Sequence, residues 1–233
     1  MNLLKPDYKF YATLLDAYKW YQASESDSCL QELIDKINRV PFVSEAASKG
    51  SAFNNLIDSI LSCGYDKLGE QITRFDSFEF NTNLVKEIAE ILTGSITQYF
   101  TSSLIQTSKG LVEIYGYIDY VQYYKAIDLK CTGSYDLGKF KGSMQKHVYP
   151  VCLADENIFV DEFEFLVTDY KGIFRESYKV DLEESKREII NVCESLIDFL
   201  EIKKPEITDR KVFGLENVMV AELDKEVNAI IVQ

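Results

Sequence analysis

Two short segments in the middle of the chain constrain its fold more than any other feature. Residues 111–121 and 125–131 are rich in β-branched and aromatic side chains, and only residues 122–124 separate them. Such residues favour extended strands, and strands joined by so short a connection pair as an antiparallel hairpin. The sequence therefore predicts a β-hairpin that turns at Tyr123 and Tyr124, with a sheet built around it.

Helical patterns surround this hairpin on both sides. Apolar residues recur at helical spacing in the ranges 8–22, 28–37, 51–61, 83–99, 143–153 and 182–201. Asp181 is placed to cap the last of these helices, and Pro150 is expected to strain or shorten the one before it. Two further strands are predicted at 159–168 and 174–180, on either side of a turn. We therefore expect an α/β fold, an α-β-α sandwich with a central mixed sheet and a helical N-terminal part.

The length of 233 residues fits one hydrophobic core with elaborations. We expect this domain to cover residues 1–205 and a C-terminal extension to cover 206–233. Short apolar runs at 218–220 and 230–232 predict edge strands or an oligomer contact in the extension.

The hairpin also carries the residues with the clearest chemical potential. Because alternate side chains of a strand share a face, Asp128 and Lys130 should project together, while Ile127 and Leu129 face the core. Asp119 reaches the same place if the two strands pair. Two carboxylates suit a hard cation such as Mg²⁺, and a lysine ammonium could orient water, help to deprotonate it, or stabilise developing charge. Taken alone, the Asp128 and Lys130 pair is also typical of a solvated strand face.

At this point the sequence resembles a known superfamily. Gly116-Tyr117-Ile118-Asp119, followed by Ile127-Asp128-Leu129-Lys130, resembles the D…(D/E)xK signature of the PD-(D/E)xK nucleases. Gln145 and Tyr149 resemble the QxxxY motif of the RecB-type and phage lambda exonuclease-like branch. The resemblance covers about residues 50–200 and implies a restriction-endonuclease-like fold.

The resemblance also implies a site and a reaction. Asp119, Asp128 and the backbone carbonyl of Leu129 would bind Mg²⁺, for which Mn²⁺ could substitute. Lys130 would assist the attacking water, and Gln145 and Tyr149 would position substrate or brace the site. The implied reaction is hydrolysis of DNA phosphodiester bonds, by an exonuclease rather than an endonuclease, in recombination, repair or phage replication.

The sequence departs from this pattern in the N-terminal helices. Many RecB-type members have a histidine where Gly50-Ser51-Ala52-Phe53-Asn54 places Asn54. An asparagine offers a carbonyl oxygen but neither charge nor imidazole, so a second metal would be weaker, absent, or supported by Glu70 or Glu90.

The net charge of −13 argues against tight nonspecific DNA binding, because proteins that hold DNA by its phosphates usually present a basic surface. Net charge does not describe distribution, however, and a bound cation reverses the local field of clustered carboxylates. The charge and Asn54 together motivate a rival hypothesis, a catalytically silent module with the nuclease fold that binds protein or nucleic acid.

The remaining features set weaker expectations. DNA is the expected partner, and a homo-oligomer and a recombination or replication protein stay open as further partners. No apolar stretch approaches the roughly 20 residues that span a bilayer, and the N-terminus lacks a signal-peptide pattern, so we expect a cytoplasmic protein with no membrane partner. The five cysteines are widely spaced and lack a CxxC pair, which predicts buried thiols.

Three groups of side chains are expected to be structural. His147, the single histidine, should be a surface or helix-packing residue. The tyrosines at 115, 117, 120, 123 and 124 should fill a sheet, although they could stack nucleobases. The acids at 155, 156, 161, 162 and 164 should form the solvated face of a strand.

Overall fold

The computed structural model describes residues 5–24, 27–66 and 68–214, and a mixed sheet of six strands forms its centre. The strands are β1 (Tyr8–Tyr11), β4 (Ile96–Thr107), β5 (Gly110–Gln122), β6 (Lys125–Cys131), β7 (Glu162–Thr168) and β8 (Ile173–Lys179). Their order is β1-β5-β6-β7-β8, and β4 also pairs with β5. The β1–β5 and β6–β7 pairs are parallel and the others are antiparallel. A separate small sheet consists of β2 (Ile72–Phe75) and β3 (Phe78–Asn81).

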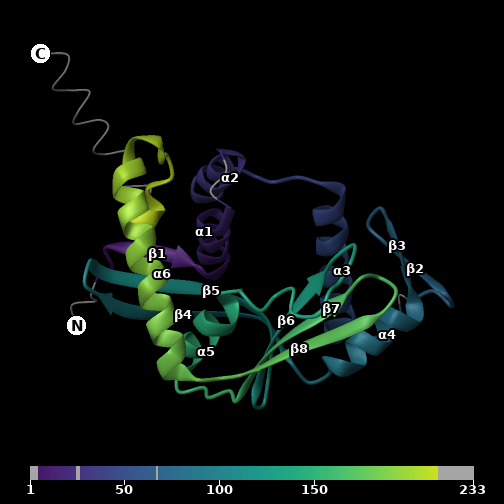
Figure 1. Ribbon diagram of the computed structural model, residues 1–233. Helices are drawn as coiled ribbons and strands as arrows, with labels where there is room; N and C mark the ends of the chain where they lie inside the picture. The colour runs from purple at the N-terminus through teal and green to yellow at the C-terminus, as the bar shows by residue number, and fades with distance from the viewer. Residues whose placement is uncertain (1–4, 25–26, 67, 215–233) are drawn as a thin grey trace, which may run out of the picture.

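Helices cover both faces of the central sheet, which confirms the expected α-β-α layering (Figure 1). The helices are α1 (Ala12–Ser24), α2 (Asp27–Ile37), α3 (Glu45–Cys63), α4 (Thr82–Ile91), α5 (Gln145–Asp155) and α6 (Leu182–Lys203). One hydrophobic core lies between the sheet and α1, α2, α5 and α6. The second core lies between the sheet and α3 and α4. No helix among the described residues is long and apolar enough to cross a membrane.

The predicted hairpin is confirmed. Strands β5 and β6 pair with Gln122 opposite Lys125, so Tyr123 and Tyr124 form the turn. Ile127 and Leu129 are buried in the core beneath α3 and α4, as the alternation of side chains predicts.

Two strands of the central sheet, β1 and β4, were not predicted from the sequence, and neither were β2 and β3 of the small sheet. Residues 8–11 form β1 instead of the first turn of a helix, and β4 replaces the end of the helix expected over 83–99. Both segments pair with β5, β1 in parallel and β4 in antiparallel register. The partner of β1 lies about a hundred residues further along the chain, and the partner of β4 lies across a turn. Local apolar spacing suggested a helix because it does not report hydrogen bonds to such partners.

The predicted helix boundaries also change in two places. Helix α3 begins earlier than expected, at Glu45, because the Ser44 side chain accepts a hydrogen bond from the Ala47 backbone N–H at 3.1 Å. Helix α5 continues through Pro150 to Asp155, and the expected shortening is wrong. Pro150 is buried, so packing offsets the backbone hydrogen bond that proline cannot make.

Residues beyond the long helix α6 are partly described. Two short 3-10 helices, Lys204–Glu206 and Arg210–Phe213, follow α6. Ile207 and Val212 are buried in the core that α1 and α6 share. The apolar runs at 218–220 and 230–232 lie outside the described residues.

Several side chains differ from the expected burial. Tyr120 is buried, but Tyr117, Tyr123 and Tyr124 are largely exposed, so the hairpin tyrosines do not simply fill the sheet. Cys152 and Cys193 are buried, whereas Cys63 is exposed.

The largest departure is Glu164, which was expected on a solvated face and is fully buried. Lys125 Nζ donates to its Oε2 atom at 2.7 Å, and Arg175 Nε donates to its Oε1 atom at 2.7 Å. These cations come from β6 and β8, on either side of β7, so ion pairs link the three strands. The negative charge of this buried carboxylate is balanced by the two cations instead of being solvated by water.

His147 gives a testable pH dependence. Its Nδ1 atom lies 3.0 Å from the Ser185 hydroxyl between α5 and α6. Burial, reinforced by nearby Lys146, lowers the pKa of His147 from 6.5 to about 4. The folded state therefore binds the proton more weakly than the unfolded state, so stability is full above about pH 6.5 and falls as pH drops towards about 4.

We expect His147→Gln to lose less stability than the wild type between pH 7 and pH 4.5, by about 1 kcal/mol once solvent screening of this half-buried ring is allowed for, because glutamine does not titrate. Urea denaturation of both proteins at the two pH values measures this difference. An identical pH dependence of the two unfolding free energies would contradict it.

Candidate active site

The sheet divides where the predicted catalytic residues lie. Strands β5 and β6 pair only over three positions next to the turn, from Tyr120 to Gln122. Further along, β5 pairs with β4 and β1, while β6 pairs with β7. Asp119 stands at the point of separation, and its Oδ2 atom accepts a hydrogen bond from the Leu129 backbone N–H at 2.9 Å. Here the Asp119 side chain, instead of a backbone carbonyl of β5, accepts the hydrogen bond from β6, and the two strands diverge beyond this point. We call this divergence the fork.

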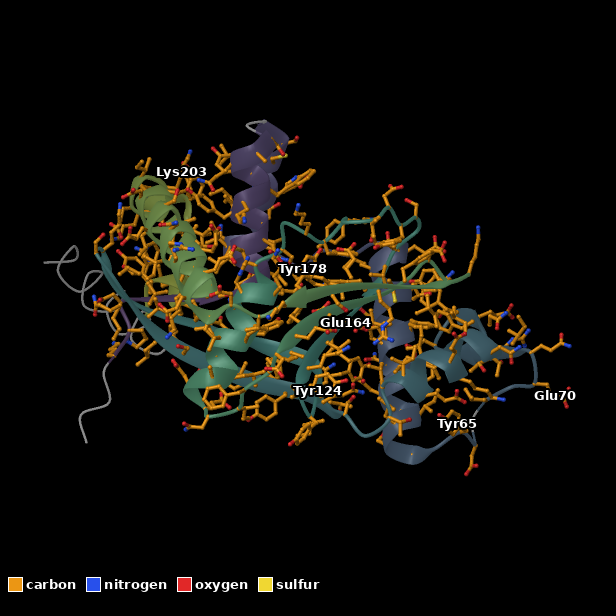
Figure 2. The ribbon with its side chains drawn as sticks, turned by 60° about the horizontal axis from the view of Figure 1, so that its bottom comes forward. Tyr65, Glu70, Tyr124, Glu164, Tyr178 and Lys203 are labelled. Carbon is orange, nitrogen blue, oxygen red and sulfur yellow. The ribbon has the colours of Figure 1, made fainter. Side chains whose placement is uncertain are left out.

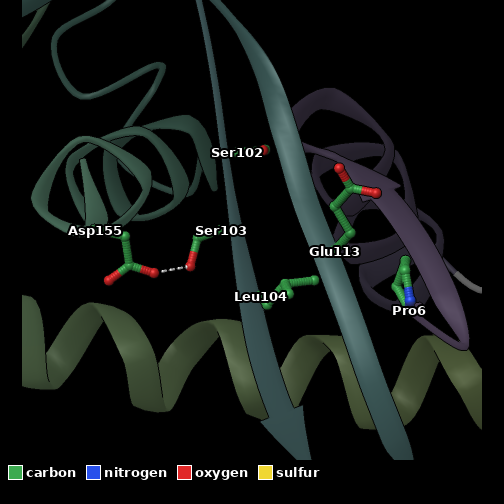
Figure 3. Close-up of a pocket in the computed structure, with 6 residues that line it drawn as sticks. All are labelled: Pro6, Ser102, Ser103, Leu104, Glu113 and Asp155. Atoms are coloured by element: carbon green, nitrogen blue, oxygen red, sulfur yellow. Dashed lines mark hydrogen bonds between the residues drawn. The ribbon is translucent and has the colours of Figure 1, made fainter. Parts of the chain in front are cut away.

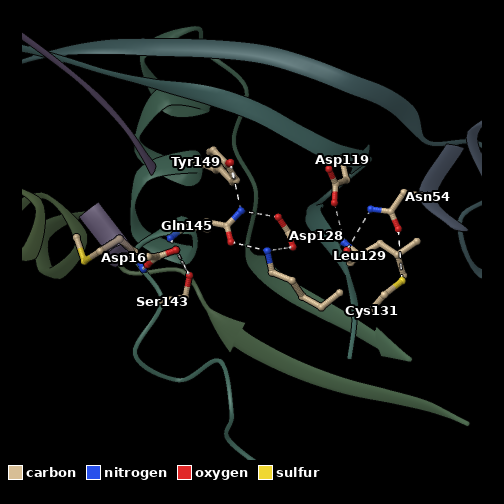
Figure 4. Close-up of polar contacts among 11 residues, drawn as sticks. Asp16, Asn54, Asp119, Asp128, Leu129, Cys131, Ser143, Gln145 and Tyr149 are labelled. Carbon is tan, nitrogen blue, oxygen red and sulfur yellow. Dashed lines mark hydrogen bonds and ion pairs between the residues drawn. The ribbon is translucent and has the colours of Figure 1, made fainter. Parts of the chain in front are cut away.

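Asp128 and Lys130 lie inside this fork and contact Gln145 of helix α5. Figure 4 shows Asp128 beside Gln145. Lys130 Nζ is 2.7 Å from Asp128 Oδ2 and donates to Gln145 Oε1 at 2.8 Å. The Gln145 amide nitrogen donates to Asp128 Oδ1 at 2.5 Å, and it lies 3.3 Å from the Tyr149 hydroxyl. Gln145 therefore bridges the acid and the base, and all five predicted catalytic residues meet in one place.

The charges of this group are strongly coupled. Burial raises the pKa of Asp119, and the charge of Asp128 raises it further. Burial alone would lower the pKa of Lys130, but Asp128 and Asp119 outweigh burial and raise it. The lysine is accordingly an ammonium, positioned to donate hydrogen bonds and to stabilise negative charge.

Asn54 occupies the position where the sequence departs from the nuclease pattern. Its amide nitrogen lies 3.5 Å from the Leu129 carbonyl oxygen, and its Oδ1 atom faces the Cys131 thiol at 3.7 Å. Glu70 and Glu90 are exposed, and neither makes a hydrogen bond or ion pair with a site residue in the described part of the chain. Figure 2 shows Glu70 at the periphery of the molecule. The structure places Asn54 at the site but not the two glutamates.

The donor set is suited to a hard divalent cation. Two carboxylates and one backbone carbonyl, from Asp119, Asp128 and Leu129, lie around the fork (Figure 4). Asp128 Oδ2 is buried and makes no hydrogen bond within the described residues, although the Lys130 ammonium is close. No group of three or more His, Cys, Asp or Glu residues with metal-ligand placement occurs among the described residues. Magnesium typically takes one or two carboxylates and leaves its other positions to water and phosphate.

Asp16 is a site residue that the sequence did not reveal. It lies on α1, and its carboxylate accepts hydrogen bonds from the Met144 backbone N–H and from the Ser143 hydroxyl. Met144 precedes α5 and has no side chain that can cap the helix, so Asp16 supplies the cap from another element. It thereby fixes the start of α5, where Gln145 stands. No spacing in the sequence marks this contact, because its partners lie more than a hundred residues away.

Gly116 gives a second testable prediction. A Cβ atom at this position would lie 2.7 Å from a ring carbon of Tyr149, which is itself 3% exposed and cannot move aside. Gly116→Ala should therefore displace Tyr149 and destabilise the protein by about 1–3 kcal/mol. Thermal denaturation measures this loss. The matched control is Gly133→Ala, where an added Cβ meets open space, and equal losses for the two variants would contradict the prediction.

Comparison with known proteins identifies the fold. No protein-family model matches the sequence, and no curated protein does. The crystal structure of SSO0001 superposes with a TM-score of 0.50 and 13% identity, and the match covers 85% of this chain and 79% of that one. A protein from Eubacterium rectale described as a "Putative exonuclease" superposes with a TM-score of 0.50 and 14% identity, over 83% of this chain and 81% of that one. At this low sequence identity, the likeness to the two structures shows a shared fold alone, with a central mixed sheet and helices.

Proposed function

We propose that this protein is a metal-dependent DNA nuclease, and more specifically an exonuclease that acts in recombination, repair or phage replication. The observation that carries the proposal is the convergence of Asp119, Asp128 and Lys130 at the fork of the sheet, held by Gln145. The exonuclease mode draws its support from the QxxxY resemblance and from the name of the Eubacterium rectale protein.

Each side chain has a role that its contacts support. Asp119, Asp128 and the Leu129 carbonyl would hold Mg²⁺, or Mn²⁺ in its place. When bound, the cation supplies positive charge that makes water more acidic and stabilises charge on the phosphate. Lys130 would donate hydrogen bonds to the negative charge on the phosphate, and Gln145 holds Lys130 and Asp128 in position by bonding to both. Tyr149 braces Gln145 from one turn further along α5.

The proposal is tested by incubating the purified full chain with linear duplex, closed circular and single-stranded DNA in Mg²⁺, Mn²⁺ or EDTA. We expect loss of linear DNA with either cation and none with EDTA, because the two carboxylates repel each other and the phosphate without a cation. Intact circular DNA would support the exonuclease mode, whereas cleavage of circular DNA would favour an endonuclease. No metal-dependent loss of any substrate would favour the catalytically silent module.

Metal binding can be measured separately from activity. Calorimetric titration with Mn²⁺ should give a saturable site in the wild type, and Asp128→Asn should weaken binding by at least about tenfold, because one of two carboxylate ligands is lost. The matched control is Asp169→Asn, which changes a half-buried acid in the β7–β8 turn; the amide oxygen of asparagine can still accept the hydrogen bond from the Gly172 backbone N–H. Equal affinities for Mn²⁺ in all three proteins would show that the fork is not a metal site.

A further inference from the structure

Strand β4 forms an unusual edge of the central sheet. It pairs only with β5 in the described part of the chain, over almost its full length of twelve residues. No described backbone group outside β5 bonds to it. Alternate N–H and C=O groups along its outer side are therefore unpaired, and such a row is a template for another strand.

This edge lacks the features that usually prevent strand addition. None of the twelve residues of β4 is charged, and none is proline. The opposite edge strand, β8, is different, because three of its seven residues are charged: Arg175, Glu176 and Lys179. Proteins commonly protect long edges with charges or proline. An uncharged edge of this length is consistent with a strand that pairs with a strand of another molecule when the protein functions.

One face beside this edge carries three large apolar side chains, which alternate with the polar Gln98, Ser102 and Gln106. Ile96, Phe100 and Leu104 recur along β4 and are 58%, 48% and 44% exposed. Tyr117 of β5 extends the same strip, with its ring centroid 5.1 Å from that of Phe100. Helix α3 contacts this face at Gln98, whose amide nitrogen donates to Asp58 at 3.2 Å, but the core beneath α3 and α4 includes no described residue of β4. An added strand would place every second side chain beside this strip.

The other face beside the edge is acidic. Helix α5 ends there, and Asp155 and Glu156 accept hydrogen bonds from hydroxyl groups of β4, from Ser103 and from Thr101 respectively. Figure 3 shows Asp155 bonded to Ser103 on this side of β4, whereas Glu113, the cross-strand partner of Leu104, lies on the other side. The C-terminal end of a helix adds negative potential of its own. Inward side chains of an added strand would therefore meet negative charge.

We propose that the outer edge of β4 binds an extended segment of a partner protein as an additional strand, with apolar side chains on one face and lysine or arginine on the other. The apolar face packs beside Phe100 and Leu104, and the basic face meets Asp155 and Glu156. A second copy of this chain fits less well, because it would bring Asp155 and Glu156 of two chains together in a protein of net charge −13. This binding is independent of the proposed nuclease activity.

The experiment uses the full chain and three synthetic nine-residue peptides. The first alternates valine and lysine, the second has the same composition with the valines in one block, and the third alternates valine and glutamate. Fluorescence anisotropy of labelled peptides should show binding of the first, with the second at least about tenfold weaker and the third not bound. Hydrogen exchange should slow at the amides of residues 96–107 when the first peptide is present.

Two double variants test the two faces. Asp155→Asn with Glu156→Gln removes the acidic face, and Phe100→Ser with Leu104→Ser removes the apolar strip; each should weaken binding about tenfold. The control, Asp76→Asn with Glu87→Gln, changes two exposed acids at the other end of the molecule and should bind normally. All six side chains are substantially exposed, so the variants should fold.

Three results would overturn the proposal. The block peptide could bind as tightly as the alternating one, which would indicate nonspecific charge attraction. Exchange could slow elsewhere than in β4. Sedimentation could reveal a dimer that already protects β4 without peptide, which would identify a second copy as the occupant.

Discussion

Replacing Lys130 with alanine is expected to reduce metal-dependent DNA hydrolysis by at least about a thousandfold, the range found when a charge-stabilising or proton-transferring group is removed from an active site. The ammonium of Lys130 lies 2.7 Å from Asp128 Oδ2 and is held by Gln145, so its position in the fork is fixed before substrate arrives. Alanine leaves the carboxylates in place but removes the donor. Initial rates on linear duplex DNA in saturating Mg²⁺ measure the effect.

The control variant is Lys171→Ala, which removes an exposed lysine from the turn between β7 and β8. It should keep wild-type rates, and thermal denaturation should show that Lys130→Ala is folded. Asp128→Asn should lose activity to a similar extent because it removes a charged ligand without changing the size of the side chain. If Lys130→Ala degraded DNA at the wild-type rate and still required a metal ion to do so, the catalytic assignment of this lysine would be wrong.

Replacing Glu164 with alanine is expected to lower the free energy of unfolding by about 3 kcal/mol, the cost of leaving buried charge unpaired. Lys125, which is 9% exposed, would keep Glu162 as its one acidic partner among the described residues, and Arg175 would lose the carboxylate of Glu164. Urea denaturation at pH 7 measures the loss.

Glu162→Ala is the matched control for this prediction. Glu162 lies on the same strand and contacts the same lysine at 2.7 Å, but its side chain is 31% exposed. An exposed pair is commonly worth under about 1 kcal/mol, so the control should lose much less stability than Glu164→Ala. Equal losses would show that burial does not determine the value of these ion pairs.

The pH dependence of the Glu164 contribution has a definite sign. Burial opposes ionisation, but hydrogen bonds from Arg175 and Lys125 outweigh it and hold the pKa of Glu164 below its ordinary value. Its stabilising effect is therefore complete above the pKa of the unfolded chain and is lost as pH falls through the folded value. The difference between wild type and Glu164→Ala should shrink in acid.

Local patterns predicted the parts of the site that lie within one strand or one helix. Asp128 and Lys130 share a face because strand geometry alternates, and Gln145 and Tyr149 share a face because they are one helical turn apart. The hairpin turn brings Asp119 near them without any information from the rest of the chain. These relations span at most a few tens of residues.

The sequence by itself thus determined the hairpin and the layered fold class, and its resemblance to the PD-(D/E)xK nucleases indicated the residues that meet at the fork. Only the tertiary structure decided that residues 8–11 and 96–107 are strands, that Asp16 caps α5, and that Glu164 is buried between two cations. The reason is physical: periodicity reports which face of a segment is apolar, whereas pairing, capping and charge compensation depend on partners that folding brings from distant parts of the chain.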